Sequence, residues 1–161
     1  MLDPRALANL LLDIAEQEGV SITNLALNKI AYFVHGTYLS MTGNPLIDAK
    51  IEAWQYGPVF REVYHQFKEF GDRPLNIRAK TLNATTGQYE ISPYDIEQKE
   101  YDFLREIAIP YIRMRASALV ELSHVQNGPW HKAWFYDGTA NPGMEITDES
   151  IRSHFCQQVR H

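Results

Sequence analysis

The feature that most constrains this chain is a run of apolar side chains with helical period between Leu27 and Met41. Its apolar members recur at steps of three and four residues, at Leu27, Ile30, Ala31, Val34, Tyr38 and Met41. Phe33 and Leu39 widen the apolar stripe, so other elements should cover this helix on more than one side. Gly43 ends the helix and Pro45 prevents it from resuming. We therefore expect a central helix around which the rest of the chain packs.

Caps and apolar periods predict further helices before and after the central one. Asp3 and Pro4 should begin a helix that ends at Gly19, and Thr23 should cap the central helix. Additional helices are expected from Gly57–Pro58 to Phe70, from Ser92–Pro93 to Pro110, after Ala116, around Trp130 and Trp134, and after Thr147.

Short strands are expected in two places. Ile47, Ile51 and Ala53 lie on alternate positions before Gly57, and Leu75–Ile77 and Tyr89–Ile91 allow a strand pair with its loop at 83–87. A length of 161 residues fits one domain. About six helices with two or three short strands predict a mainly α fold, a compact single-domain helical bundle over residues 1–161.

The charge balance and the single cysteine narrow the function classes. The net charge of −5, from 20 acidic and 15 basic residues, argues against a general nucleic-acid binder, which needs a concentrated basic face. Cys156 is alone, so no internal disulfide can form and a reducing compartment is expected. No apolar run approaches the length of about 18 residues that spans a membrane. We expect a soluble cytoplasmic protein without a membrane partner.

The sequence predicts no catalytic residue, metal site or cofactor. None of the six histidines forms the His-Glu-x-x-His pattern that places two imidazoles on one helix face, and no glycine-rich phosphate loop occurs. His124 ends a helix before Pro129, where its ring is expected to donate to a backbone carbonyl and hold that turn. The enzyme hypothesis has no positive support, so a protein without enzymatic activity is expected.

Large rings crowd the segment from Ile51 to Tyr64. Trp54 and Phe60 are expected to lie in the core, because rings of this size usually become buried. Tyr56, Arg61 and Tyr64 belong to the amphipathic residue types that are enriched at protein interfaces, and they are the candidate contacts for a partner. Trp130, four residues before Trp134, is a further candidate contact.

Three motifs are spread along the chain. They are Leu27-Asn-Lys29-Ile-Ala-Tyr32-Phe33 with Gly36, then Ile51-Glu52-Ala53-Trp54-x-Tyr56-Gly57-Pro58-Val59, and finally Glu121-Leu122-Ser123-His124 with Gly128-Pro129-Trp130. Together they resemble one known family, the Panacea domain, also called the SocA-like antitoxin domain. Asn28 stands where the family commonly has glutamine, Ser123 where it has threonine, and Arg115 where a capping serine is usual. The resemblance covers about residues 5–156. It implies a structural role for Lys29, Tyr32, Trp54, Gly57, Pro58, Phe60, His124 and Pro129.

The resemblance also implies a function. It predicts an antitoxin of a type II toxin–antitoxin module, or of a related phage-defence module, that neutralises a cognate protein toxin by direct binding. One alternative is a proteolytic adaptor that delivers the toxin to a protease of the ClpXP type. Another is a nucleic-acid-binding regulator, which the charge of −5 disfavours.

Overall fold

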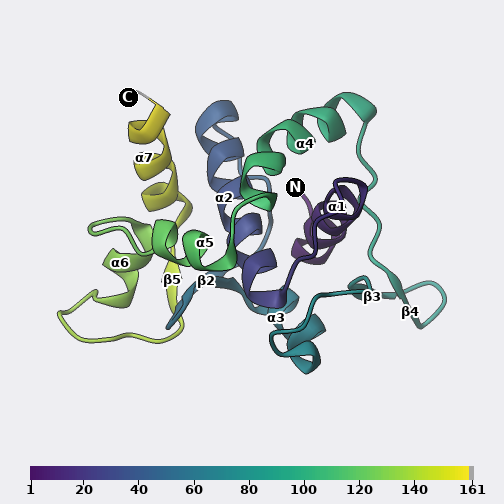
Figure 1. The fold of residues 1–161 in the computed structure, drawn as a ribbon, viewed down its shortest axis with the longest axis horizontal. Helices are drawn as coiled ribbons and strands as arrows, with labels where there is room; N and C mark the ends of the chain where they lie inside the picture. Colours follow the sequence, from purple (N-terminus) through teal and green to yellow (C-terminus); the bar gives the residue numbers. More distant parts are fainter. Residues whose placement is uncertain (160–161) are drawn as a thin grey trace.

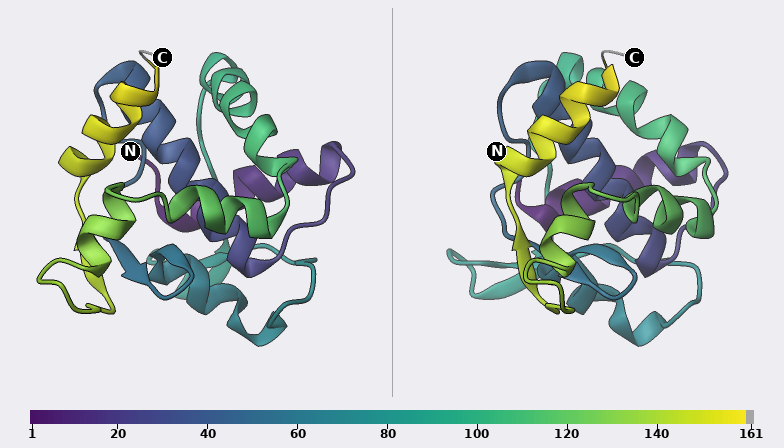
Figure 2. Two further views of the ribbon diagram at one scale, coloured as in Figure 1. Left: turned by 60° about the vertical axis from the view of Figure 1, so that its left-hand side comes forward. Right: turned by 90° about the vertical axis from the view of Figure 1, so that its left-hand side faces the viewer.

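The structure is a computed structural model that describes residues 1–159, except for the side chain of Val159 (Figures 1 and 2). Within these residues the chain forms seven α-helices, one 3-10 helix and five short strands. They are α1 (Pro4–Gln17), α2 (Asn24–Thr42), β1 (Ile51–Trp54), β2 (Gly57–Phe60), α3 (Arg61–Phe67), η1 (Lys68–Phe70), β3 (Lys80–Asn83), β4 (Gln88–Ile91), α4 (Gln98–Ile112), α5 (Ala116–Ser123), α6 (Pro129–Trp134), β5 (Met144–Ile146) and α7 (Asp148–Val159). The prediction of a compact, mainly α protein is confirmed.

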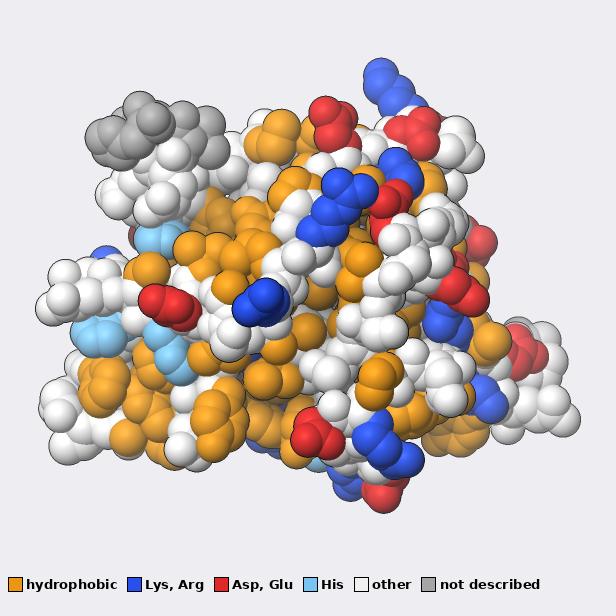
Figure 3. Space-filling view, in the orientation of Figure 1, with side chains coloured by type: hydrophobic (Ala, Val, Ile, Leu, Met, Phe, Trp, Pro, Cys, Tyr) orange, Lys and Arg blue, Asp and Glu red, His pale blue; other side chains and the backbone are white. Residues whose placement is uncertain are grey.

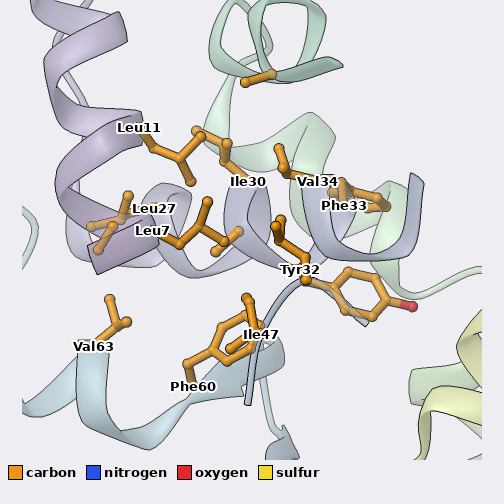
Figure 4. Packing of buried hydrophobic residues seen from close by; sticks show 14 of the residues in the cluster. Leu7, Leu11, Leu27, Ile30, Tyr32, Phe33, Val34, Ile47, Phe60 and Val63 are labelled. Carbon is orange, nitrogen blue, oxygen red and sulfur yellow. The ribbon is translucent and has the colours of Figure 1, made fainter. Parts of the chain in front are cut away.

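Helix α2 runs through the centre of the molecule and contacts α1, α3, α4, α5 and α7 as well as β2. Figure 4 shows Leu27 and Ile30 of α2 facing Leu7 and Leu11 of α1, while Phe60 approaches from the sheet. All of these side chains are at most 1% exposed. The expectation of a helix covered on several sides is therefore confirmed, although Met41, the last member of the stripe, is 57% exposed.

The expected caps set the ends of several helices. The Asp3 side chain accepts from the backbone N–H of Arg5, and Pro4 is the first residue of α1. The Thr23 hydroxyl accepts from the N–H of Ala26 at 3.2 Å, while Gly43 ends α2 at a φ of 76°. These helix caps could be predicted from the sequence because each involves residues only a few positions apart.

A three-stranded antiparallel sheet with the order β2-β1-β5 lies below α2. Ile51 is opposite both Phe60 of β2 and Ile146 of β5, so the middle strand is paired on each side. The prediction that Gly57–Pro58 begins a helix is wrong: this segment is strand β2, and the helix begins at Arg61. Pro58 fits there because β2 is an edge strand, where a missing N–H removes no ladder hydrogen bond.

A second hairpin, β3–β4, projects from the body of the molecule (Figure 1 and the right-hand view of Figure 2). Its first strand begins at Lys80, later than the predicted 75–77, while its second strand includes the predicted Tyr89–Ile91. Ser92 does not cap α4, which begins at Gln98. Its hydroxyl donates to Thr81, and its backbone carbonyl accepts from the side chain of Asn9 in α1. Helix α4 ends two residues beyond Pro110, at Ile112.

Helix α7 closes the side of α2 away from α4. The Phe155 ring packs directly on Gly36, where an added Cβ would lie 2.5 Å from the ring. The buried Tyr32 ring meets Phe155 edge to face, with 5.7 Å between the ring centroids. Glycine at position 36 therefore allows the two helices to approach closely.

Candidate functional site

The turn between β1 and β2 is held in place by a glycine that no other residue can replace without strain. Gly57 has a φ of 119°, a region that side chains rarely allow. A Cβ at this position would lie 2.5 Å from Cε of Lys29 and 2.7 Å from Oγ of Ser123. The turn residues Gln55 and Tyr56 are thus fixed against α2 and α5 by close backbone packing.

Lys29 lies beneath this turn and is fully buried. Its Nζ donates to the backbone carbonyl of Pro58 at 3.0 Å and so ties α2 to the edge strand. Burial lowers the pKa of Lys29 to about 7, because the charged form loses its hydration. The structural role implied by the family resemblance thus corresponds to a specific bond, and the group that makes it titrates near neutral pH.

Two asparagines of α2 continue this connection toward α3. Oδ1 of Asn28 accepts from the backbone N–H of Phe60 at 2.9 Å, and its Nδ2 donates to Asn24. Asn24 in turn donates to the backbone carbonyl of Tyr64 at 3.1 Å. Sequence reasoning did not select Asn24, and it noted Asn28 only as a departure from the family. Their i, i+4 spacing, which places both amides on one face of the helix, was the available indication in the sequence.

On the other side of the turn, Trp130 fixes the end of β1. Its indole Nε1 donates to the backbone carbonyl of Trp54 at 2.7 Å, and its side chain is 6% exposed. Trp130 is therefore part of the core and is not available as a partner contact. Pro129, which precedes it, is also buried and begins α6.

The prediction that the His124 ring donates a hydrogen bond to a backbone carbonyl is wrong. Its ring stacks on Trp130 with 3.8 Å between centroids, and its Nε2 is buried without a hydrogen-bond partner. Burial, and then the nearby Lys29, lower the pKa of His124. His124 therefore supports Trp130 by stacking, and the neutral form of its ring is favoured.

A cavity of about 450 Å³, here called the Trp54 pocket, opens beside the turn. Its lining residues are Asn24, Leu25, Asn28, Lys29, Trp54, Gln55, Tyr56, Val59, Tyr64, Lys68 and Gly71. The Trp54 and Tyr64 rings meet edge to face with centroids 4.8 Å apart, and Tyr56 is 61% exposed. The volume falls within the range of small-ligand and side-chain binding pockets, roughly 300–1,000 Å³.

The structure thus divides the rings of this segment differently from the prediction. Phe60 is fully buried beneath α2, as expected, but Trp54 is only half-buried and lines the pocket beside Tyr56 and Tyr64. The prediction that Trp54 belongs to the core is wrong, because Trp54 lies at the turn end of β1, on the face opposite Ala53, where its side chain lines the pocket.

Arg61 lies next to the pocket but does not line it. Its guanidinium forms a two-pronged ion pair with Glu52, with distances of 2.9 and 3.0 Å. Glu52 is opposite Val59 in the sheet, and Val59 lines the pocket, so the ion pair and the pocket share the outer face of the sheet. Arg61 retains an exposed side chain at this border.

Three further findings concern the rest of the molecule. In residues 1–159, no three His, Cys, Asp or Glu side chains come together as possible metal ligands. None of the helices in that range is long and apolar enough to cross a membrane. On the face shown in Figure 3, Lys and Arg side chains lie among Asp and Glu side chains, and hydrophobic side chains gather over α6 and the segment after it.

Comparison with known proteins assigns the family. The family model described as "Antitoxin SocA-like, Panacea domain" matches residues 27–131, which include most of α2, the turn, most of the residues that line the Trp54 pocket, and Trp130. The chain therefore belongs to the Panacea-domain, SocA-like family.

One similar protein is Antitoxin SocA of Caulobacter vibrioides (strain NA1000 / CB15N). It is 37% identical over 155 residues, which cover 96% of this chain and 82% of that protein. No solved structure gives a significant match. The similarity extends over nearly the whole chain and is not confined to the segment that the family model matches.

Proposed function

We propose that this protein is an antitoxin that neutralises a cognate protein toxin by direct binding. Its family membership and its similarity to Antitoxin SocA of Caulobacter vibrioides support the general role. The observation that carries the binding mode is the Trp54 pocket with the exposed Tyr56 at its edge. Tyrosine and tryptophan supply much contact area with few rotatable bonds, which suits recognition of another protein.

The rigidity of the site supports binding without rearrangement. Lys29 and Asn28 hold β2, Trp130 holds the end of β1, and Gly57 fits closely between α2 and α5. A turn fixed in this way loses little conformational entropy when a partner binds, so more of the contact energy contributes to affinity. We infer a preformed surface that covers the toxin or holds it inactive, without enzymatic activity of its own.

Co-expression of this chain with the protein encoded by the neighbouring reading frame tests the proposal. We expect restored growth and a co-eluting complex on gel filtration that buries at least about 1,200 Å² in total. Toxicity without rescue, together with no complex, would contradict the proposal. If rescue instead depends on a ClpXP-type protease and the toxin's half-life shortens, the proteolytic-adaptor alternative explains the neutralisation.

Variants of the exposed ring test the location of the surface. Tyr56→Ala removes an exposed side chain, so we expect weaker neutralisation and a melting temperature within a few degrees of the wild type. Tyr64→Ala should act in the same direction, since Tyr64 lines the same pocket. Tyr89→Ala is the matched control, because Tyr89 is 69% exposed on the distant β4. Equal effects at positions 56 and 89 would contradict the assignment of this surface.

A further inference from the structure

The charged side chains that line the Trp54 pocket are all basic. Its lining contains Lys29 and Lys68 and, among the described residues, no aspartate or glutamate. The chain as a whole has the opposite balance, with 20 acidic and 15 basic residues. Within residues 1–159, the only ionisable groups with an acid–base charge in the pocket lining are thus the two lysines, on a protein that is acidic as a whole. This arrangement favours an anionic group on the partner.

The buried Lys29 has more hydrogen-bonding capacity than the protein uses. A protonated amine carries three N–H donors, and the bond to Pro58 accounts for one of them. The other donors are shielded from solvent, since the residue is 0% exposed. A buried charge with unfilled donors is unfavourable, and a carboxylate bound in the pocket above Lys29 would offset that cost through its negative charge.

The aromatic side chains of the pocket determine which kind of group can lie beside the carboxylate. The Trp54 and Tyr64 rings stand edge to face, and Val59 adds an apolar surface between strand and helix. Such walls favour an apolar side chain, while Lys68 at the start of η1 supplies a second positive charge. An occupant that satisfies both requirements has a carboxylate and an apolar group close together.

We propose that the Trp54 pocket binds an acidic segment of the partner protein, with a carboxylate directed to Lys29 and Lys68 and an adjoining apolar side chain between Trp54 and Tyr64. This inference rests on the proposed function and specifies which part of the toxin is recognised. Stacked nucleic-acid bases would also suit aromatic walls, but phosphate binding along a strand needs a basic groove. The net charge of −5 and the mixed charges on the face in Figure 3 favour the protein segment.

Photo-crosslinking identifies the segment directly. A photoreactive phenylalanine is placed at Tyr56, and for the control at Tyr89, in the complex with the protein of the neighbouring reading frame. We expect position 56 to crosslink to a segment that contains Asp or Glu beside an apolar residue. Replacement of those acids by Asn or Gln should weaken the complex about 10-fold or more. Crosslinks to a basic segment, or binding of a single-stranded oligonucleotide that competes with the partner, would overturn the inference.

Lysine variants measure the contribution of the two charges. Lys29→Met should weaken the complex about 10- to 100-fold, and Lys68→Met about 2- to 5-fold, because Lys68 lies at the solvated rim. Lys99→Met, an exposed position on α4, is the control and should bind like the wild type. Circular dichroism of each variant establishes that it is folded. Should Lys29→Met fail to fold, Lys68→Met and the acidic variants of the partner still decide the question.

Proton uptake separates anion binding from a structural role of Lys29. With a pKa of about 7, Lys29 is mostly neutral at pH 8, and a bound carboxylate would favour its charged form. His124, the titratable neighbour of Lys29, is also neutral at that pH because its own pKa is lowered. Calorimetry in two buffers should therefore record about one proton taken up per complex, which Lys29→Met abolishes.

The outcomes are distinguishable from those for the proposed function. If the wild-type protein forms no complex with its neighbour, the proposed function itself is contradicted. If the wild type binds and neutralises, but both lysine variants bind equally well and no proton is taken up, only the inference about an acidic segment is overturned.

Discussion

The two β-hairpins of this protein have strands of equal length but opposite environments. Every residue of strands β1 and β2 except Trp54 is buried, whereas β4 is exposed along its whole length. The first hairpin is held by Lys29 and Asn28 of α2 and by Trp130 of α6. The second is joined to the body mainly at its base, through Asn9 and Gln66.

This difference shows what makes a short hairpin suitable as a binding site. An isolated two-stranded hairpin is only marginally stable in water, so its surroundings decide how precisely its residues are placed. The β1–β2 turn presents Tyr56 from a fixed backbone, while the exposed Leu82, Tyr89 and Ile91 lie on a hairpin with few such supports. Exposure of apolar side chains alone would have favoured β3–β4, whereas the site that we propose lies at the better-supported hairpin.

The largest effect that the comparison predicts is at Phe60. Phe60→Ala removes a fully buried ring under α2 and should lower the free energy of unfolding by about 3–5 kcal/mol. The matched change in the other hairpin, Ile91→Ala, should cost less than about 0.5 kcal/mol, since Ile91 is 58% exposed. Urea denaturation measures both. Similar losses would mean that the hairpins are equally integrated.

Lys29 should make the stability of the first hairpin depend on pH. Folding lowers the pKa of Lys29 from 10.5 to about 7, so above pH 7 the unfolded chain binds more protons than the folded one. Stability therefore rises with pH between about 7 and 10.5. Relative to Lys29→Met, the wild type should gain about 2 kcal/mol between pH 7 and pH 9. Parallel stability curves for the two proteins would contradict a depressed pKa.

The glycines of the two hairpins provide a matched pair. Gly57→Ala should destabilise the protein by about 1–3 kcal/mol through backbone strain, with an added cost for displacing Lys29 and Ser123. Gly87, in the β3–β4 loop, also has a positive φ of 71°, but an added Cβ there has no neighbour within 4 Å. Gly87→Ala should thus cost about 1–2 kcal/mol from strain alone. Thermal unfolding of both variants gives the difference, which disappears if close packing at Gly57 is unimportant.

The smallest predicted effect is on the exposed β3–β4 hairpin. Leu82 and Tyr89 are directly opposite and exposed, so Leu82→Thr with Tyr89→Thr should change the unfolding free energy by less than about 0.5 kcal/mol. Hydrogen exchange should show fast exchange in β3–β4 and slow, globally protected amides in β1–β2. Slow exchange throughout β3–β4 would require supports beyond those at its base.

Sequence reasoning succeeded where structure depends on neighbouring residues and was wrong where it depends on distant ones. The extent of α2 and its caps at Thr23 and Gly43 follow from short-range patterns. By contrast, strand β5 has three residues and no recognisable period, and it exists because β1 offers it a partner. Likewise, Ser92 and Pro93 look like a helix start, but the polar groups of Ser92 bond to Thr81 and Asn9 instead.

The candidate site was predicted in outline. The rings of residues 51–64 were identified, and Tyr56 and Tyr64 do line one pocket. What the sequence could not provide was the burial of Trp130, which depends on the carbonyl of Trp54 lying within reach of its indole. The place of Trp54 in the pocket wall depends in the same way on β1 pairing with both β2 and β5.

The pairing of β1 with β5 also has a consequence for synthesis on the ribosome. Ile51 and Ile146 are far apart in the chain, yet they are partners in one sheet, and α7 covers α2 immediately afterwards. A nascent chain that has not yet exposed these last elements cannot complete the sheet or bury the Phe155 side of α2. Translation of residues 1–140 alone therefore leaves both the sheet and the cover of α2 incomplete.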